Sequence, residues 1–80
     1  MSKNLEIDHQ YQQYLKRMQL DETKMHPQQK IETKRAFYGG FSQLLALMFN
    51  DVADIDDEDK AVLTLEDLSV QCEQFWKTQK

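Results

Sequence analysis

Residues 27–53 read PQQKIETKRAFYGGFSQLLALMFNDVA, and this stretch decides the fold. Pro27 suits the first position of a helix, where a backbone N–H has no acceptor within the helix. Two heptad positions follow it, occupied by Ile31, Tyr38, Leu45 and Val52 and by Lys34, Phe41 and Met48. Because this repeat keeps one side of a helix largely apolar, it predicts a long helix over about residues 27–53.

The segment that follows predicts a second long helix. Residues 51–59 hold six acidic side chains in nine positions, and Asp56 or Asp57 is suited to cap a helix N-terminus. Apolar residues then recur at alternate spacings of four and three: Ala61, Leu65, Leu68, Cys72 and Phe75. Two matched stripes joined by a short acidic loop predict an antiparallel helical hairpin, over about 27–53 and 57–78. Cys72 is expected on its buried side, as a small apolar residue.

A shorter helix is predicted near the N-terminus. Over about residues 8–19 the apolar side chains of Tyr11, Tyr14, Leu15 and Met18 recur at helical spacing. Asp8 is expected to cap this helix, and Asp21 or Thr23 to cap an extra turn in the linker. Residues 1–7 are expected to be loosely ordered. The sequence therefore predicts one all-α domain over residues 1–80, with the short first helix packed on the hairpin.

Composition supports a small folded protein inside a cell. The 80 residues are 40% hydrophobic and 30% charged, with two glycines and one proline. The single cysteine cannot form an internal disulfide, and no signal-peptide pattern precedes it, which favours the cytoplasm. The most apolar stretch spans residues 44–49, far fewer than the roughly 20 residues that cross a bilayer. We therefore expect no membrane contact.

The glycine pair at 39–40 lies inside the predicted long helix and calls for an explanation. Each glycine costs a helix about 1 kcal/mol relative to alanine. One explanation is a kink or local unwinding. The other is a close approach of the first helix, or of a second subunit, to a small-residue patch, which we favour. The patch comprises Ala36, Gly39, Gly40 and Ala46.

The two long helices also carry large apolar residues outside the heptad positions that form the hairpin. One short helix is too small to cover them all, so part of this surplus is expected to lie at an interface. The candidate interface residues are Phe49, Leu47, Leu63, Val70 and Trp76. A protein-interaction module that forms a dimer, or binds another protein, is the function that this surplus favours.

Charge divides unevenly along the chain and supports two alternatives. Residues 1–40 carry seven Lys and Arg against five Asp and Glu, whereas residues 41–80 carry three against nine. Lys16, Arg17, Lys30, Lys34 and Arg35 form a candidate basic patch. With the tyrosines nearby, this patch is one that could bind nucleic acid, which requires cations for phosphates and aromatic rings for bases. The acidic half raises the third hypothesis of a nucleic-acid mimic that inhibits another protein.

The sequence offers no catalytic machinery. Asp54, Asp56 and Glu58 resemble the start of a calcium loop, but Asp59 replaces its required glycine and Leu65 its final carboxylate. The remaining reactive residues are His9, His26, Ser42 and Cys72, and their spacing matches no known catalytic motif. We therefore predict a non-enzymatic protein without a cofactor or a bound metal.

Two short segments resemble known proteins. Residues 24–27, KMHP, followed by residues 32–39, ETKRAFYG, are similar to the central segment of small proteins encoded by bacteriophages and prophages. The resemblance covers about residues 11–50 and recurs at residues 73–76, EQFW. No activity is assigned to those proteins, so the resemblance implies only a gene product that acts inside a bacterial cell.

Overall fold

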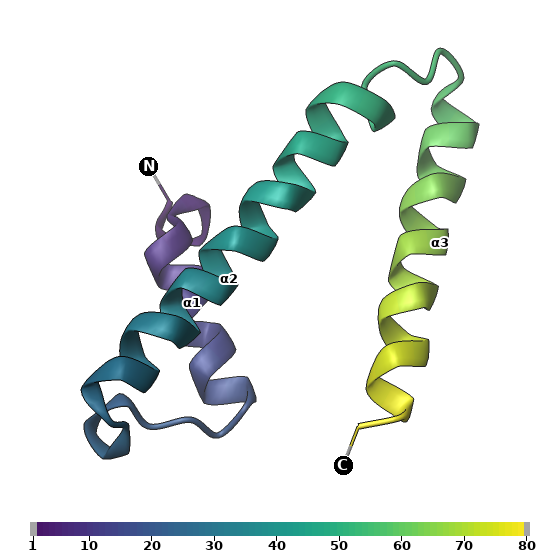
Figure 1. Ribbon diagram of the computed structural model, residues 1–80. Helices are drawn as coiled ribbons and strands as arrows, with labels where there is room; N and C mark the ends of the chain where they lie inside the picture. Colours follow the sequence, from purple (N-terminus) through teal and green to yellow (C-terminus); the bar gives the residue numbers. More distant parts are fainter. Residues whose placement is uncertain (1, 80) are drawn as a thin grey trace. The chain divides into compact units, whose positions relative to one another are not determined.

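The computed structural model describes residues 2–79, and within them the chain is all α-helical, without a strand (Figure 1). Three α-helices follow in order: α1 (Ile7–Arg17), α2 (Pro27–Leu47) and α3 (Glu58–Lys77). Shorter helical turns are η1 (Lys3–Leu5), η2 (Glu22–Lys24) and η3 (Met48–Val52). The predicted fold class is therefore confirmed. None of the described helices is both long enough and apolar enough to cross a membrane.

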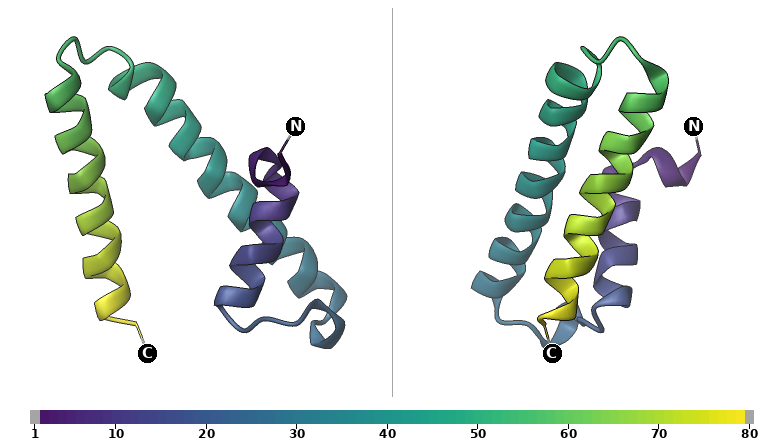
Figure 2. Two further views of the ribbon diagram at one scale, coloured as in Figure 1. Left: turned by 180° about the vertical axis from the view of Figure 1, so that it is seen from behind. Right: turned by 90° about the vertical axis from the view of Figure 1, so that its right-hand side faces the viewer.

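The chain divides into two compact units, which we call unit 1 (Met1–Gln43) and unit 2 (Leu44–Lys80). In unit 1, α1 lies against the first half of α2 (Figures 1 and 2). Tyr11 is fully buried and Leu15 is 4% exposed. Because residues four apart share one side of a helix, these two side chains form the buried face of α1.

The start of α1 differs from the prediction. The helix begins at Ile7 after Glu6, whose side chain makes no capping hydrogen bond, and Asp8 lies in the first turn. Its carboxylate still suits the positive end of the helix dipole. Residues 3–5 form a 3₁₀ turn capped by the Ser2 hydroxyl, and Gln10 Nε2 donates to the Asn4 carbonyl at 2.8 Å. Residues 3–5 thus have a defined turn and Ile7 begins α1, while the expected loose order of residues 1–7 stays a prediction; Met1 lies outside the described residues.

The end of α1 is a complete Schellman motif. Gln19 adopts a left-handed conformation with φ of 57°. The Gln19 and Leu20 backbone N–H groups donate to the carbonyls of Lys16 and Leu15 at 3.1 and 2.8 Å. This pairing satisfies carbonyls that a helix end leaves free. It ends α1 at Arg17, before the predicted limit of residue 19.

The linker contains the predicted extra turn. Asp21 caps η2 by accepting hydrogen bonds from the Thr23 N–H at 2.9 Å and the Thr23 hydroxyl at 2.6 Å. These bonds favour the ionised carboxylate, so they lower the pKa of Asp21 below 3.8. Pro27 then begins α2 as predicted, and the His26 imidazole accepts from the Gln28 N–H.

Helix α2 ends differently from the prediction. It is α-helical to Leu47 and continues as the π-helical turn η3 rather than as α-helix to residue 53. The Ala53 N–H donates to the Met48 carbonyl, five residues earlier, at 2.9 Å. Val52, the last residue of this turn, is buried.

Helix α3 matches its predicted span closely but not its predicted burial. Asp57 caps it by accepting from the Asp59 N–H at 2.9 Å. Ala61 and Leu68 are half-buried, whereas Leu65 and Phe75 are 40% and 56% exposed. Cys72 is also exposed, so its predicted burial is wrong.

Within unit 2, little chain is available to cover α3. Only residues 44–52 of α2 and η3 belong to unit 2, beside the twenty residues of α3. At 1.5 Å per residue, about nine residues span less than half of α3. Within unit 2 they are too short to cover the stripe, and no described residue of α3 is buried. Pairing of α2 and α3 as a complete hairpin stays a prediction.

Candidate interaction surfaces

Five aromatic rings form a cluster between α1 and α2 in unit 1. The Tyr11 ring lies 5.3 Å from Phe37 and 6.5 Å from Tyr38, measured between centroids. Tyr14 and Phe41 extend the cluster, at 5.1 and 5.9 Å from Phe37. Tilted and edge-on pairs at these distances add roughly 0.5–1.5 kcal/mol each beyond the burial of area. The cluster thus holds α1 on α2.

Lys34 spans this cluster. Its Nζ lies 5.7 and 5.9 Å from the ring centroids of Tyr11 and Tyr38, and 3.6 Å from Asp8 Oδ1. Because both charged side chains are at least half exposed, the ion pair contributes about 1 kcal/mol or less. Its main effect is to direct the Lys34 ammonium toward α1. One feature of the sequence indicates this contact with α1: Lys34 occupies a heptad position that is otherwise apolar.

The Tyr11 hydroxyl is buried without a hydrogen-bond partner among the described residues. Burial is the main cause that raises the pKa of Tyr11 above 10.0, and Glu22, Tyr14 and Asp8 add to it. The buried phenol is therefore neutral at neutral pH. Because the folded state disfavours the phenolate, ionisation above the ordinary pKa favours the unfolded chain.

Tyr11→Phe tests the cost of this hydroxyl. The substitution keeps the ring and removes a polar group that lacks a partner, so we expect the free energy of unfolding to rise by roughly 1–2 kcal/mol. Urea unfolding followed by circular dichroism measures the change. Tyr14→Phe, at a half-buried ring, is the matched control, with little expected effect. A loss of stability in Tyr11→Phe would show that the hydroxyl has a partner in solution.

An open groove runs along α2 in unit 1; we call it the α2 groove. It is lined by Ile31, Lys34, Arg35 and Tyr38 and has a volume of about 320 Å³. These residues lie on one side of the helix because they are spaced by three, four and seven. The groove combines an apolar floor with two cationic side chains at its rim.

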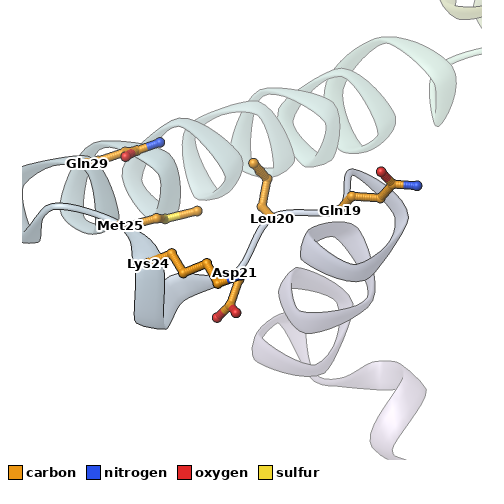
Figure 3. A pocket seen from close by; sticks show the side chains of 6 residues that line it. All are labelled: Gln19, Leu20, Asp21, Lys24, Met25 and Gln29. Carbon is orange, nitrogen blue, oxygen red and sulfur yellow. The ribbon is translucent and has the colours of Figure 1, made fainter.

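Two further grooves in unit 1 are smaller. One, of about 200 Å³, lies between α1 and α2 and is lined by Gln10, Gln13, Tyr14, Arg17, Phe37 and Phe41. The other, of about 260 Å³, lies at the linker (Figure 3). There Leu20 points toward α2 and the Asp21 carboxylate points away. Asp21 is already engaged by Thr23, so this groove offers little for a ligand.

Unit 2 exposes large apolar side chains along its helices. Phe49, at the π-helical turn, is 74% exposed, and Leu63 is 61% exposed. Phe75 and Trp76 pack edge to face, with centroids 5.2 Å apart, and both remain about half exposed. The others are Leu44, Leu45, Val62, Leu65 and Val70. Val52 is the one buried residue among the described residues of unit 2.

The structure distributes the predicted interface residues over more than one face. Leu63 and Val70, seven positions apart, share a side of α3. Trp76 lies about 120–140° around the helix axis from them, on the side of the heptad stripe. Leu47 is half-buried. A single flat interface could therefore include Trp76 together with the heptad stripe of α3, but not Leu63 and Val70 as well.

The predicted close approach of α1 to the small-residue patch is wrong. Ala36, Gly39, Gly40 and Ala46 are all exposed, and a Cβ built on either glycine meets no atom within 4 Å. Helix α2 also remains α-helical through both glycines, so local unwinding is absent there. The contacts of α1 fall instead on the aromatic face of α2, at Phe37 and Tyr38. Close approach of a second subunit stays a prediction.

The candidate basic patch is divided between surfaces. Lys34 and Arg35 line the α2 groove, whereas Arg17 lines the groove between α1 and α2. Lys16 and Lys30 are exposed. Within residues 2–79, no group of three or more His, Cys, Asp or Glu side chains is arranged to hold a metal ion. In the acidic run, Asp57 serves as the cap of α3.

No protein-family model, curated protein or solved structure matches this chain.

Proposed function

We propose that this chain is a protein-interaction module that associates with a second copy of itself. The observation that carries the proposal is the exposed apolar stripe of α3, a twenty-residue helix without a buried residue in the part described. Burying one Leu or Phe side chain contributes about 1.5–3 kcal/mol. Folded domains this small have only a few kcal/mol of net stability, so covering two or three of these side chains matters.

Symmetry supports a second copy as the partner. A two-fold dimer is the commonest closed assembly, because one surface patch meets its own counterpart without forming a filament. We further propose, from the resemblance over about residues 11–50 alone, that the module is encoded by a phage or prophage and acts inside a bacterial cell. That it catalyses no reaction is proposed separately, because the sequence has no catalytic motif.

Nucleic-acid binding has weaker support. A protein surface attracts nucleic acid more strongly when several Lys and Arg side chains lie together on it. Here Lys34 is directed toward Asp8 and the Tyr11 ring, and Arg17 lines another groove.

Sedimentation equilibrium tests self-association. We expect the mass of two chains at high protein concentration, and a dissociation constant raised about tenfold or more by Trp76→Ala, because aromatic anchors dominate interfaces. Leu5→Ala is the control, since Leu5 is 71% exposed in unit 1. Circular dichroism verifies that each variant is folded. A mass of one chain persisting to about 1 mM protein would contradict self-association.

A further inference from the structure

We propose that the α2 groove binds the last turns of α3 from a second copy, with Phe75 and Trp76 seated between Ile31 and Tyr38. Two-fold symmetry then gives each dimer two identical contacts. This inference rests on the proposed self-association and specifies its geometry.

The residues that line the α2 groove suit an aromatic side chain. Ile31 is 52% exposed and forms apolar floor beside the half-buried Tyr38 ring. The Lys34 ammonium is directed toward Asp8 and the tyrosine rings. Arg35 is exposed at the rim. A guanidinium in this position stacks favourably on an indole face.

The end of α3 has the complementary shape. Phe75 and Trp76 are 56% and 48% exposed and are fixed edge to face at an interplanar angle of 80°. Two neighbouring rings that already support each other lose little conformational freedom when they bind. The groove volume of about 320 Å³ suits side chains of this size.

Charge favours the same pairing. Unit 1 carries two more basic than acidic residues, whereas unit 2 carries six more acidic than basic. On α3, Glu73 precedes Trp76 by three residues, so both lie on neighbouring turns of the same side. With Trp76 in the groove, Glu73 comes near Arg35.

The area available predicts a weak dimer. Aromatic side chains bury roughly 150–250 Å² each when fully covered. Four half-exposed rings in two contacts therefore supply roughly 300–500 Å², and the two grooves lose a similar area. The total of roughly 600–1,000 Å² lies below the area of stable specific interfaces and in the range of weak, transient complexes.

Trp76 is the only tryptophan, so its fluorescence reports this contact directly. We expect its emission to shift to shorter wavelength over the concentration range in which the mass doubles. Acrylamide quenching should fall over the same range.

Charge reversal tests the groove itself. Arg35→Glu alone and Glu73→Arg alone should each raise the dissociation constant about tenfold, because the repulsion occurs twice per dimer. An equimolar mixture of the two variants should restore dimers, since both contacts of the mixed dimer then pair opposite charges. Arg17→Glu makes the same charge change in the other groove and should have little effect.

Four results would overturn the inference. A dimer that leaves Trp76 emission unchanged, or that tolerates both charge reversals, is built on another surface, and self-association then stands without this geometry. Single variants that weaken the dimer without recovery in the mixture would show that Arg35 and Glu73 do not meet. A shifted Trp76 emission at every dilution, with the mass of one chain, would show that Trp76 is covered within one chain and that self-association fails as well.

Discussion

Tyr11→Ala is expected to unfold unit 1. Tyr11 is the one fully buried large side chain among the described residues, and its ring touches both Phe37 and Tyr38. Replacing a buried aromatic residue by alanine costs about 3–5 kcal/mol, through lost burial and the cavity left behind. That cost is comparable to the whole stability of a domain of this size.

Loss of helical circular dichroism and of the urea unfolding transition measures this effect. Phe75→Ala removes an exposed aromatic ring from α3 and is the control at concentrations too low for association. A Tyr11→Ala protein that keeps the wild-type transition would show that α1 is held on α2 by other contacts.

Leu15→Ala is expected to have the next largest effect. Leu15 is 4% exposed, and truncating a buried leucine costs about 2–5 kcal/mol. The midpoint of urea unfolding should therefore fall sharply, with the slope of the transition unchanged if the unfolded state is the same.

Leu63→Ala provides the matched control for this truncation. Leu63 is 61% exposed on α3, so its loss should change stability by about 0.5 kcal/mol or less. Equal effects of the two substitutions would mean that α1 does not supply the core of unit 1.

Local signals in the sequence predicted most of the helices. Pro27 at the start of α2, Asp57 as the cap of α3 and Asp21 as the cap of η2 act on backbone groups within three residues. Such interactions need no knowledge of the rest of the fold. The apolar spacing likewise predicted the inward stripe of the first helix, Tyr11, Tyr14, Leu15 and Met18. Of these, Tyr11 and Leu15 are buried, and Tyr14 and Met18 are half-buried.

Contacts between elements were harder to predict. The Asp8 and Lys34 ion pair joins two helices, and its geometry depends on how α1 crosses α2. The π-helical turn after Leu47 adds one residue to a helical turn and shifts every later position on the wheel. The heptad spacing of α3 also identifies an apolar face without specifying what covers it, and Cys72 on that face is exposed.

Helix α2 has the residues of lowest helix propensity, apart from Pro27 at its start, near its centre rather than at its ends. Gly39 and Gly40 lack side chains, and no neighbouring atom lies where a Cβ would be. The glycines therefore allow no close packing that would repay the entropy they lose in a helix. Amide protons of this turn can exchange with water through a local opening that leaves Tyr11 and Leu15 packed, at a lower free energy than global unfolding requires. We therefore expect hydrogen exchange to divide α2 into two shorter helices joined at the glycine pair.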